Sequence, residues 1–199
     1  MTTDLRARIR AGDREAFAEL YDAHVRAIYN HGFRLTADWS MAEDVVSDTF
    51  LQAWRLRARL DPEAGSLRPW LFGIATNIAR NLRRGDRRYR AAVLAATRDL
   101  PIVEDHAAVT DSRIDDARRL TAAMTALAAL PRADREVFTL CVWEELDYAA
   151  AAEALGIPIG TVRSRLSRAR RKIRRELPAP DRPVTGDSTT TTRHTGGLR

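Results

Sequence analysis

A candidate DNA-reading segment runs from Gly160 to Leu177, with the sequence GTVRSRLSRARRKIRREL. Arginine can pair bidentately with guanine in a major groove, and serine can donate to or accept from several bases. At about 3.6 residues per turn, the segment separates into two faces. The polar face comprises Arg163, Ser164, Ser167, Arg168 and Arg171, and the apolar face comprises Val162, Leu166, Ala169 and Ile173. The spacing therefore predicts a helix that packs by one face and reads DNA with the other.

The residues before this segment favour a helix, a turn and a second helix. Residues 148–154 (YAAAAEA) are strong helix formers, and Gly156 suits the left-handed position after a helix end. Pro158 fits the first turn of the next helix, where an amide needs no partner. A solvated, arginine-rich terminal helix would explain the charge equally well, but it would not explain the turn. The order of these elements predicts a helix-turn-helix.

Helical spacing also accounts for the N-terminal half, which has no convincing alternation of the kind typical of strands. Residues 15–35 predict one core helix or a broken pair. Residues 41–57 predict a second helix, with Ser40 as N-cap and Glu43 three residues later, the spacing of a capping box. Residues 69–84 predict a third helix, after a loop rich in turn residues. The predicted fold class is therefore all-α.

The helix expected over residues 41–57 has two faces of different character. The stripe expected to be buried comprises Val45, Val46, Thr49, Phe50, Ala53 and Trp54. The residues expected outside it are Asp44, Asp48, Gln52 and Arg55.

Composition limits the possible partners and compartment. The 199 residues are 45% hydrophobic, enough for one or two modest cores, and the formal charge of +6 favours an anionic partner. Cys141 is the single cysteine, which excludes an internal disulfide and a cysteine-based zinc cluster. A reducing cytoplasm is the expected compartment. No segment has the apolar character of a signal peptide or a bilayer span, so we expect no membrane insertion.

Shifts in composition predict four parts of the chain. Residues 1–98 form the first helical domain, and residues 99–117 form an acidic linker interrupted by Pro101. Residues 118–177 form the second domain, which contains the helix-turn-helix. Residues 178–199 are rich in proline, threonine and glycine and are expected to be a disordered tail.

Three motifs now carry a family resemblance: AEDVVSDTFLQAWR from Ala42, GSLRPWLFGIATNIARNLRR from Gly65, and LGIPIGTVRSRLSRAR from Leu155. In this order and separation they form a highly specific signal. The chain resembles an extracytoplasmic-function (ECF) sigma factor, the small two-domain class of bacterial RNA polymerase initiation factors. The resemblance covers nearly everything from Asp13 to Leu177. It implies two helical domains joined by a flexible linker, which bind core RNA polymerase and promoter DNA.

The resemblance also implies roles for particular residues. It implies that the helix over residues 41–57 docks on core polymerase through Asp44, Asp48, Gln52 and Arg55. The −10 element would be bound by Ser66, Asn77, Arg80, Asn81 and Arg84, with the loop over residues 61–66 capturing a flipped base. The −35 element would be bound by Thr161, Arg163, Ser164, Arg165, Ser167, Arg168 and Arg171. For the docking face and the two asparagines, ordinary solvated or internally bonded positions are the alternative.

Further expectations follow from the resemblance. The acidic linker resembles a segment that threads through the polymerase, although a merely solubilising linker fits its sequence as well. An anti-sigma factor is a further candidate partner, because many relatives have one. The family usually carries a glutamate and a branched aliphatic residue where this chain has Ala149, Ala150 and Ala151, so a phosphate or packing contact there could be missing.

Enzymatic functions find little support in the sequence. His24, His31, His106 and His194 lack metal-ligand spacing, and no glycine-rich phosphate loop occurs. We therefore expect no catalytic site, no cofactor and no small-molecule substrate. Two other classes remain as alternatives: a polymerase-independent helix-turn-helix regulator, and a DNA recombinase or nuclease. The N-terminal motifs with Trp54 and Asn77 argue against the regulator, and the surroundings of Tyr21 and Tyr29 argue against the enzyme.

Overall fold

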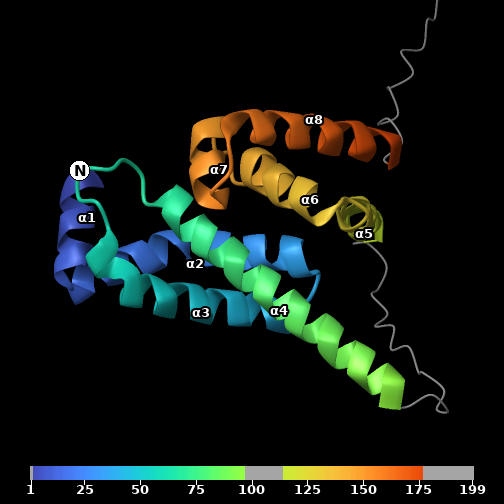
Figure 1. Cartoon of the computed structure of the whole chain (residues 1–199), viewed down its shortest axis with the longest axis horizontal. Helices are drawn as coiled ribbons and strands as arrows, with labels where there is room; N and C mark the ends of the chain where they lie inside the picture. Colours follow the sequence, from blue (N-terminus) through green and yellow to red (C-terminus); the bar gives the residue numbers. More distant parts are fainter. Residues whose placement is uncertain (1, 97–113, 177–199) are drawn as a thin grey trace, which may run out of the picture.

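The computed structural model describes residues 2–96 and 114–176, and every regular element in these ranges is helical (Figure 1). The predicted all-α class is confirmed. The predicted tail and nearly all of the predicted acidic linker lie outside the described residues. The last four residues of that predicted linker are instead helical, because α5 begins at Ile114.

The N-terminal half consists of four helices and one short 3₁₀ turn. They are α1 (Thr2–Ala11), α2 (Arg14–Thr36), α3 (Trp39–Leu56), the 3₁₀ turn Arg57–Arg59 and α4 (Arg68–Ala96). Helices α2, α3 and α4 pack on one another around a shared apolar core. The sequence left open whether residues 15–35 form one helix or a broken pair. The structure has one continuous helix there. Asp13 caps this helix by accepting from the backbone N–H groups of Glu15 and Ala16.

Helix α3 has the predicted faces but a different start. Val45, Thr49, Phe50 and Ala53 are buried, and Val46 and Trp54 are partly buried, as the stripe predicted. The N-cap is Asp38, not Ser40 as predicted. Asp38 has extended backbone angles, and its carboxylate accepts from the Met41 N–H at 2.9 Å, whereas Ser40 already lies inside the helix. An earlier side chain thus takes the capping role, because aspartate satisfies the free amides of a first turn as well as serine does.

The C-terminal half contains the predicted helix-turn-helix. Its elements are α5 (Ile114–Ala128), α6 (Arg132–Phe138), a π-helical turn (Thr139–Trp143), α7 (Tyr148–Leu155) and α8 (Ile159–Glu176). Gly156 ends α7 at φ 62° and ψ 40°, in the left-handed region that favours glycine. Pro158 precedes α8, and its carbonyl accepts from the N–H groups of Thr161 and Val162. The predicted turn is therefore confirmed, with the proline one residue before the helix.

The two halves pack against each other, with α7 seated on α4 (Figure 1) and Glu136 of α6 bonded to Arg80 in the middle of α4. We call this contact the domain interface. The helices approach closely at Gly73 on α4, where an added Cβ would lie 2.6 Å from the carbonyl oxygen of Ala154 on α7. Ala151 and Ala152 on α7 are also buried. Small residues on both helices thus allow the two backbones to approach closely.

Replacing Gly73 should therefore disturb the domain interface. We expect Gly73→Ala to lower the free energy of unfolding by about 1–3 kcal/mol, because the backbone oxygen of Ala154 cannot move aside cheaply. Gly85→Ala in the same helix is the matched control, since nothing lies within 4 Å of its added Cβ. There the gain in helix propensity should raise stability by about 0.5–1 kcal/mol. Urea denaturation measures both variants, and equal effects would contradict the close approach of α7.

Candidate nucleic-acid interface

Helix α8 presents its predicted polar face to solvent. Val162, Leu166 and Ala169 are buried in the core, and Ile173 packs against it. Arg163, Ser164, Ser167, Arg168 and Arg171 are all exposed, whereas Thr161 and Arg165 are partly buried. The two faces predicted from the spacing are thus present.

The arginines of this face divide between two grooves. Arg163 lies over the Tyr148 ring of α7, 5.9 Å from its centroid, in a groove that also contains Ser167 and Arg171. Arg168 turns to the other side and donates two hydrogen bonds to Asp134 of α6, at 3.1 and 2.9 Å. An arginine held by a carboxylate is oriented, but it must exchange that partner to contact a base. The sequence pattern did not indicate Asp134, which is distant along the chain.

The groove beside Tyr148 also contains arginines that the spacing placed outside the reading face. Arg170 and Arg174 line it together with Arg163, Leu166, Ser167 and Arg171. Their side chains add positive charge beside the reading face. Such charge suits phosphate contacts, which position a helix in a groove without reading sequence.

The residues predicted to dock on the polymerase line a single groove between α3 and α4. Its volume is 630 Å³, and Asp44, Asp48, Gln52 and Arg55 all contribute to it. Asn81 of α4 lines the same groove, although its predicted partner was DNA. The exposed Leu51, with 47% of its surface accessible, adds an apolar side chain. The groove thus combines acidic, amide and apolar groups.

The residues predicted to bind the −10 element are spread over α4 and the loop before it. Asn77 is exposed, and its Oδ1 accepts from Arg80 Nη1 at 2.9 Å. Ser66 Oγ accepts from the N–H of Arg68 at 3.2 Å. Arg84 is exposed and has no hydrogen bond or ion pair with any described residue. Asn77 and Asn81 therefore do not share one set of neighbours, although they lie one turn apart.

The loop before α4 is held from α1 by Arg6, which the sequence did not single out. Arg6 is only 3% exposed. Its guanidinium donates to the carbonyl oxygens of Asp61, Gly65 and Ser66 at 3.1, 3.0 and 3.3 Å. A loop whose carbonyls are fixed in this way keeps its shape, because each bond restricts the backbone that carries it.

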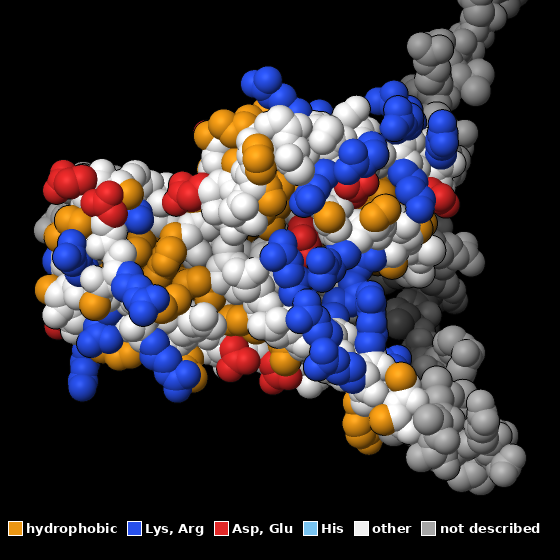
Figure 2. Space-filling view, in the orientation of Figure 1, with side chains coloured by type: hydrophobic (Ala, Val, Ile, Leu, Met, Phe, Trp, Pro, Cys, Tyr) orange, Lys and Arg blue, Asp and Glu red, His pale blue; other side chains and the backbone are white. Residues whose placement is uncertain are grey.

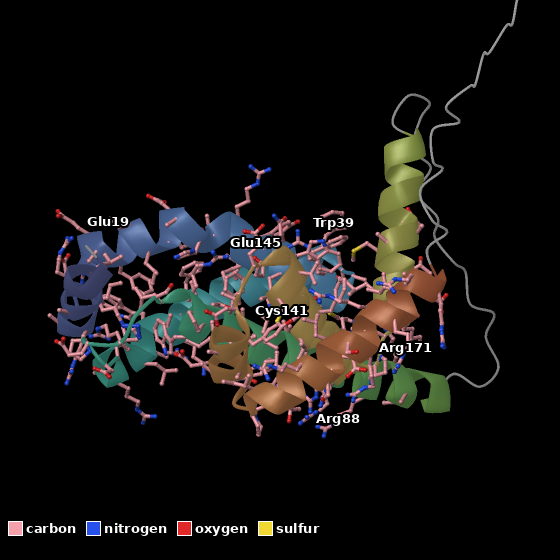
Figure 3. All side chains as sticks on the ribbon, turned by 90° about the horizontal axis from the view of Figure 1, so that it is seen from above. Glu19, Trp39, Arg88, Cys141, Glu145 and Arg171 are labelled. Carbon is pink, nitrogen blue, oxygen red and sulfur yellow. The ribbon has the colours of Figure 1, made fainter. Side chains whose placement is uncertain are left out.

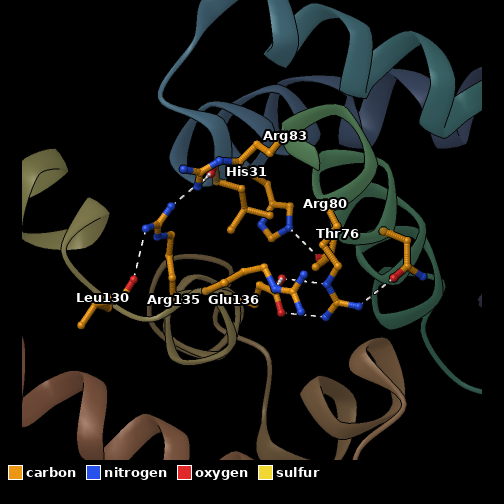
Figure 4. Close-up of polar contacts among 10 residues, drawn as sticks. His31, Thr76, Arg80, Arg83, Leu130, Arg135 and Glu136 are labelled. Carbon is orange, nitrogen blue, oxygen red and sulfur yellow. Dashed lines mark hydrogen bonds and ion pairs between the residues drawn. The ribbon is translucent and has the colours of Figure 1, made fainter. Parts of the chain in front are cut away.

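Arg80 is not free in this arrangement, since it pairs with Glu136 across the domain interface (Figure 4). Its Nε and Nη2 atoms lie 2.7 Å from the two carboxylate oxygens of Glu136, which is 2% exposed. Nearby, Arg83 donates to the carbonyl of Leu35 at 2.7 Å, and Arg135 approaches the same oxygen at 3.5 Å. These contacts join residues 48 to 100 positions apart, so no local pattern predicts them.

A second buried carboxylate, Glu144, joins the halves near α2. Arg34 Nη1 lies 2.7 Å from Glu144 Oε1, and Arg68 Nη2 donates to the Glu144 carbonyl at 2.7 Å. Burial raises the pKa of Glu144, while Arg34 and Arg68 act in the opposite direction. Both acidic groups of the interface thus face arginines of the N-terminal half.

Comparison with known proteins decides the family. Residues 20–89 match the family described as Sigma-70 region 2, and residues 120–173 match Sigma-70, region 4. The ECF RNA polymerase sigma factor SigK of Mycobacterium sp. (strain KMS) is 32% identical over 172 residues, which cover 83% of this chain and 86% of SigK. The chain belongs to the ECF sigma factor family.

Two solved structures agree with this assignment. CnrH, solved in complex with the cytosolic domain of CnrY, is 27% identical with a TM-score of 0.65 over 86% of this chain and 94% of CnrH. The sigma factor RpoE of Bartonella quintana, solved with the anti-sigma factor NepR, is 27% identical with a TM-score of 0.59. That match covers 80% of this chain and 95% of RpoE. The sigma factor family is one of transcription initiation factors.

Within residues 2–96 and 114–176, none of the helices combines the length and apolar character that a bilayer crossing requires. In the same ranges, no three histidine, cysteine, aspartate or glutamate side chains are grouped so that they could hold a metal ion.

His31 of the sigma factor is fully buried between α2 and α4 and is held in one tautomer. Thr76 Oγ1 donates to the Phe72 carbonyl, so it accepts from His31 Nε2 at 2.9 Å. His31 Nδ1 lies 4.0 Å from Glu144 Oε1, which is too far for a hydrogen bond. Burial, together with the charge of Arg34, lowers the pKa of His31 from 6.5 to about 3. The imidazole is therefore neutral in the folded protein.

The Arg80–Glu136 pair should couple strongly in a double-mutant cycle. We expect a coupling of about 1–3 kcal/mol for Arg80→Ala with Glu136→Ala, because the carboxylate is buried and both of its oxygens are used. The control is the exposed Asp86–Arg90 pair of α4, one turn apart at 2.9 Å, where about 0.3–0.5 kcal/mol is expected. Urea denaturation of the single and double variants gives both values. Similar coupling in the two pairs would show that Glu136 is not confined at the interface.

Acid should destabilise the sigma factor through His31. The pKa of His31 is about 3 when folded and 6.5 when unfolded, so between these values the unfolded chain binds the extra proton and stability falls as pH falls. This amounts to about 2 kcal/mol at pH 5. Glu144 acts in the opposite sense, since its raised pKa favours the folded state in acid.

A comparison of variants isolates this effect. His31→Gln should flatten the dependence of unfolding free energy on pH between 7 and 5, because glutamine does not titrate. His24→Gln is the control: His24 is half-buried, its pKa is lowered by burial and Arg68, and its replacement should change the slope less. An unchanged slope in His31→Gln would rule out a neutral, buried imidazole.

Proposed function

We propose that this sigma factor binds core RNA polymerase in the cytoplasm and directs promoter recognition, opening of the −10 element and initiation of transcription. The observation that carries the proposal is the exposure of three chemically different faces on three helices. Helix α3 offers acidic and amide groups, α4 offers amides and arginines, and α8 offers arginines and serines. One face suits a protein partner, and the other two suit DNA.

In this proposal, residues 118–177 form the domain that recognises the −35 element. Helix α8 enters the major groove, where Arg163, Ser164 and Ser167 face base edges. Arg168 joins them after exchanging Asp134 for DNA. Thr161, Arg165 and Arg171 flank this set and contact the phosphates. The support is the exposed polar face of α8, together with its firmly packed apolar face.

Residues 1–98 form the domain that opens the −10 element. Melting a duplex requires a site that holds an unstacked base, which polar groups in a shaped loop can provide. The loop fixed by Arg6 supplies such a shape, with Ser66 at its end. Asn77, Asn81 and Arg84 extend the site along α4, and Arg80 joins it when released from Glu136. The docking face on core polymerase is the α3 groove containing Asp44, Asp48, Gln52 and Arg55.

Binding to polymerase is proposed to separate the two domains, with residues 99–113, the part of the predicted linker that precedes α5, between them. Arg80 is held away from DNA while its Nε and Nη2 groups bond Glu136 and its Nη1 group bonds Asn77. Free protein is therefore expected to bind promoter DNA poorly, because only the polymerase holds the domains at the required separation. An anti-sigma factor is also a proposed partner, by analogy with the RpoE–NepR complex.

The test is transcription in vitro with purified bacterial core polymerase on fragments of the source genome, with and without this protein. Start sites that require the protein and share spaced −10 and −35 elements are expected. Specific DNA binding in the absence of polymerase, with no new start sites, would instead favour a polymerase-independent regulator. Magnesium-dependent cleavage of the fragments would favour an enzyme.

A variant of the reading face gives a sharper expectation. Arg163→Ala should lower initiation at protein-dependent promoters about tenfold or more and relax the preference at one −35 position, since a bidentate base contact contributes about 1–3 kcal/mol. Arg174→Ala should weaken initiation similarly at all promoters and reduce its salt dependence. Arg59→Ala, an exposed site far from α8 in the chain, should leave initiation unchanged. Equal losses in all three variants would contradict base reading by Arg163.

A further inference from the structure

A cavity of 280 Å³ lies between α4 and α6, and arginine forms most of its wall. Figure 2 shows the corresponding gathering of basic side chains where the two halves meet. Helix α4 contributes Arg80, Arg83, Arg84, Arg87 and Arg88, and α6 contributes Arg132 and Arg135. Glu136 is the single carboxylate among the described lining residues. Seven positive groups against one negative group leave an excess of six charges around one small cavity.

Neighbouring acidic groups do not neutralise this excess. Glu136 is already bonded to Arg80 and lies 3.6 Å from Arg132. Asp86 pairs with Arg90, outside the cavity lining. Arg84, Arg87 and Arg88 form no hydrogen bond or ion pair with any described residue. The charge of these three arginines therefore remains available to a ligand.

Arg135 is the one buried arginine among the described residues that line the cavity. It is 7% exposed, and its guanidinium donates only to carbonyl oxygens, those of Leu35, Leu127, Ala128 and Leu130. Burial and the charges of Arg83 and Arg87 lower the pKa of Arg135 to about 10. A cation without a counterion in a concave, partly desolvated site focuses positive potential into that site.

We propose that this cavity binds a compact polyphosphate, a ligand with two or more linked phosphoryl groups. Guanidinium groups match phosphate oxygens with paired hydrogen bonds, and linked phosphates concentrate several charges in a small volume. Because the arginines come from both halves, the ligand holds α6 against α4 and stabilises the arrangement in the structure. Arg80 and Arg84 belong to the proposed −10 site, so competition between ligand and promoter DNA rests on the proposed function.

Isothermal titration of the full chain with tripolyphosphate, at fixed ionic strength and without polymerase, tests the binding. One ligand per chain is expected. Arg87→Glu on α4 and Arg132→Glu on α6 should each weaken binding about tenfold or more, the loss of one charge-assisted contact. Arg59→Glu introduces the same charge change at an exposed position outside the cavity lining, and it should have little effect. Circular dichroism checks that each variant is folded.

The outcomes separate the explanations. Equal weakening by all three variants, or equal binding of sulfate, would reduce the effect to diffuse attraction and overturn the proposal. Weakening by Arg87→Glu alone would overturn the bridging of α4 and α6. If single-stranded DNA bound and tripolyphosphate did not, the arginines would be a DNA-binding surface and the polyphosphate proposal would be wrong. Tighter binding of ATP than of tripolyphosphate would identify a nucleotide as the source, and equal binding would identify phosphate groups alone. None of these readouts depends on transcription, so failure here leaves the initiation function untouched.

Discussion

Two buried carboxylates determine how the halves of this sigma factor fit together. Burying a carboxylate costs free energy unless it is paired with a positive group. Removing either partner leaves the other charge buried and unpaired. Glu136 and Glu144 both belong to the C-terminal half, and both meet arginines of the N-terminal half, Arg80 and Arg34. Any other docking of α6 on α4 would have to provide equivalent partners. The close packing of α7 on Gly73 belongs to this same arrangement.

The helices and their faces could be predicted from the sequence because their determinants are local. The stripe around Phe50 and the two faces of α8 follow from spacing. Gly156 predicts the turn after α7, because the left-handed backbone there favours glycine. The error at the start of α3 is also instructive. Asp38 and Ser40 are both competent caps, and the sequence pattern cannot say which of two cap residues so close in the chain adopts the extended backbone.

The candidate site was less predictable, since much of it depends on contacts between distant segments. The exposure of Asp44, Asp48, Gln52 and Arg55 follows from one helix, and they were predicted together. Asn81 joined that groove only because α4 crosses α3 beside it. No sequence pattern indicates that Asp134 binds Arg168 or that Glu136 binds Arg80, since both acidic residues resemble ordinary surface charges on a short helix. Figure 3 shows Arg88 of α4 and Arg171 of α8 on the same side of the molecule, although 83 positions separate them.

The shared carbonyl of Leu35 has a consequence for reversibility. Arg83 and Arg135 both reach this oxygen, one from each half. If the halves separate as proposed, Leu35 keeps Arg83, and Arg135 keeps the carbonyls at the junction of α5 and α6. No hydrogen-bonding group at this point is stranded in either state. Such a separation would therefore cost little in unsatisfied hydrogen bonds at this contact.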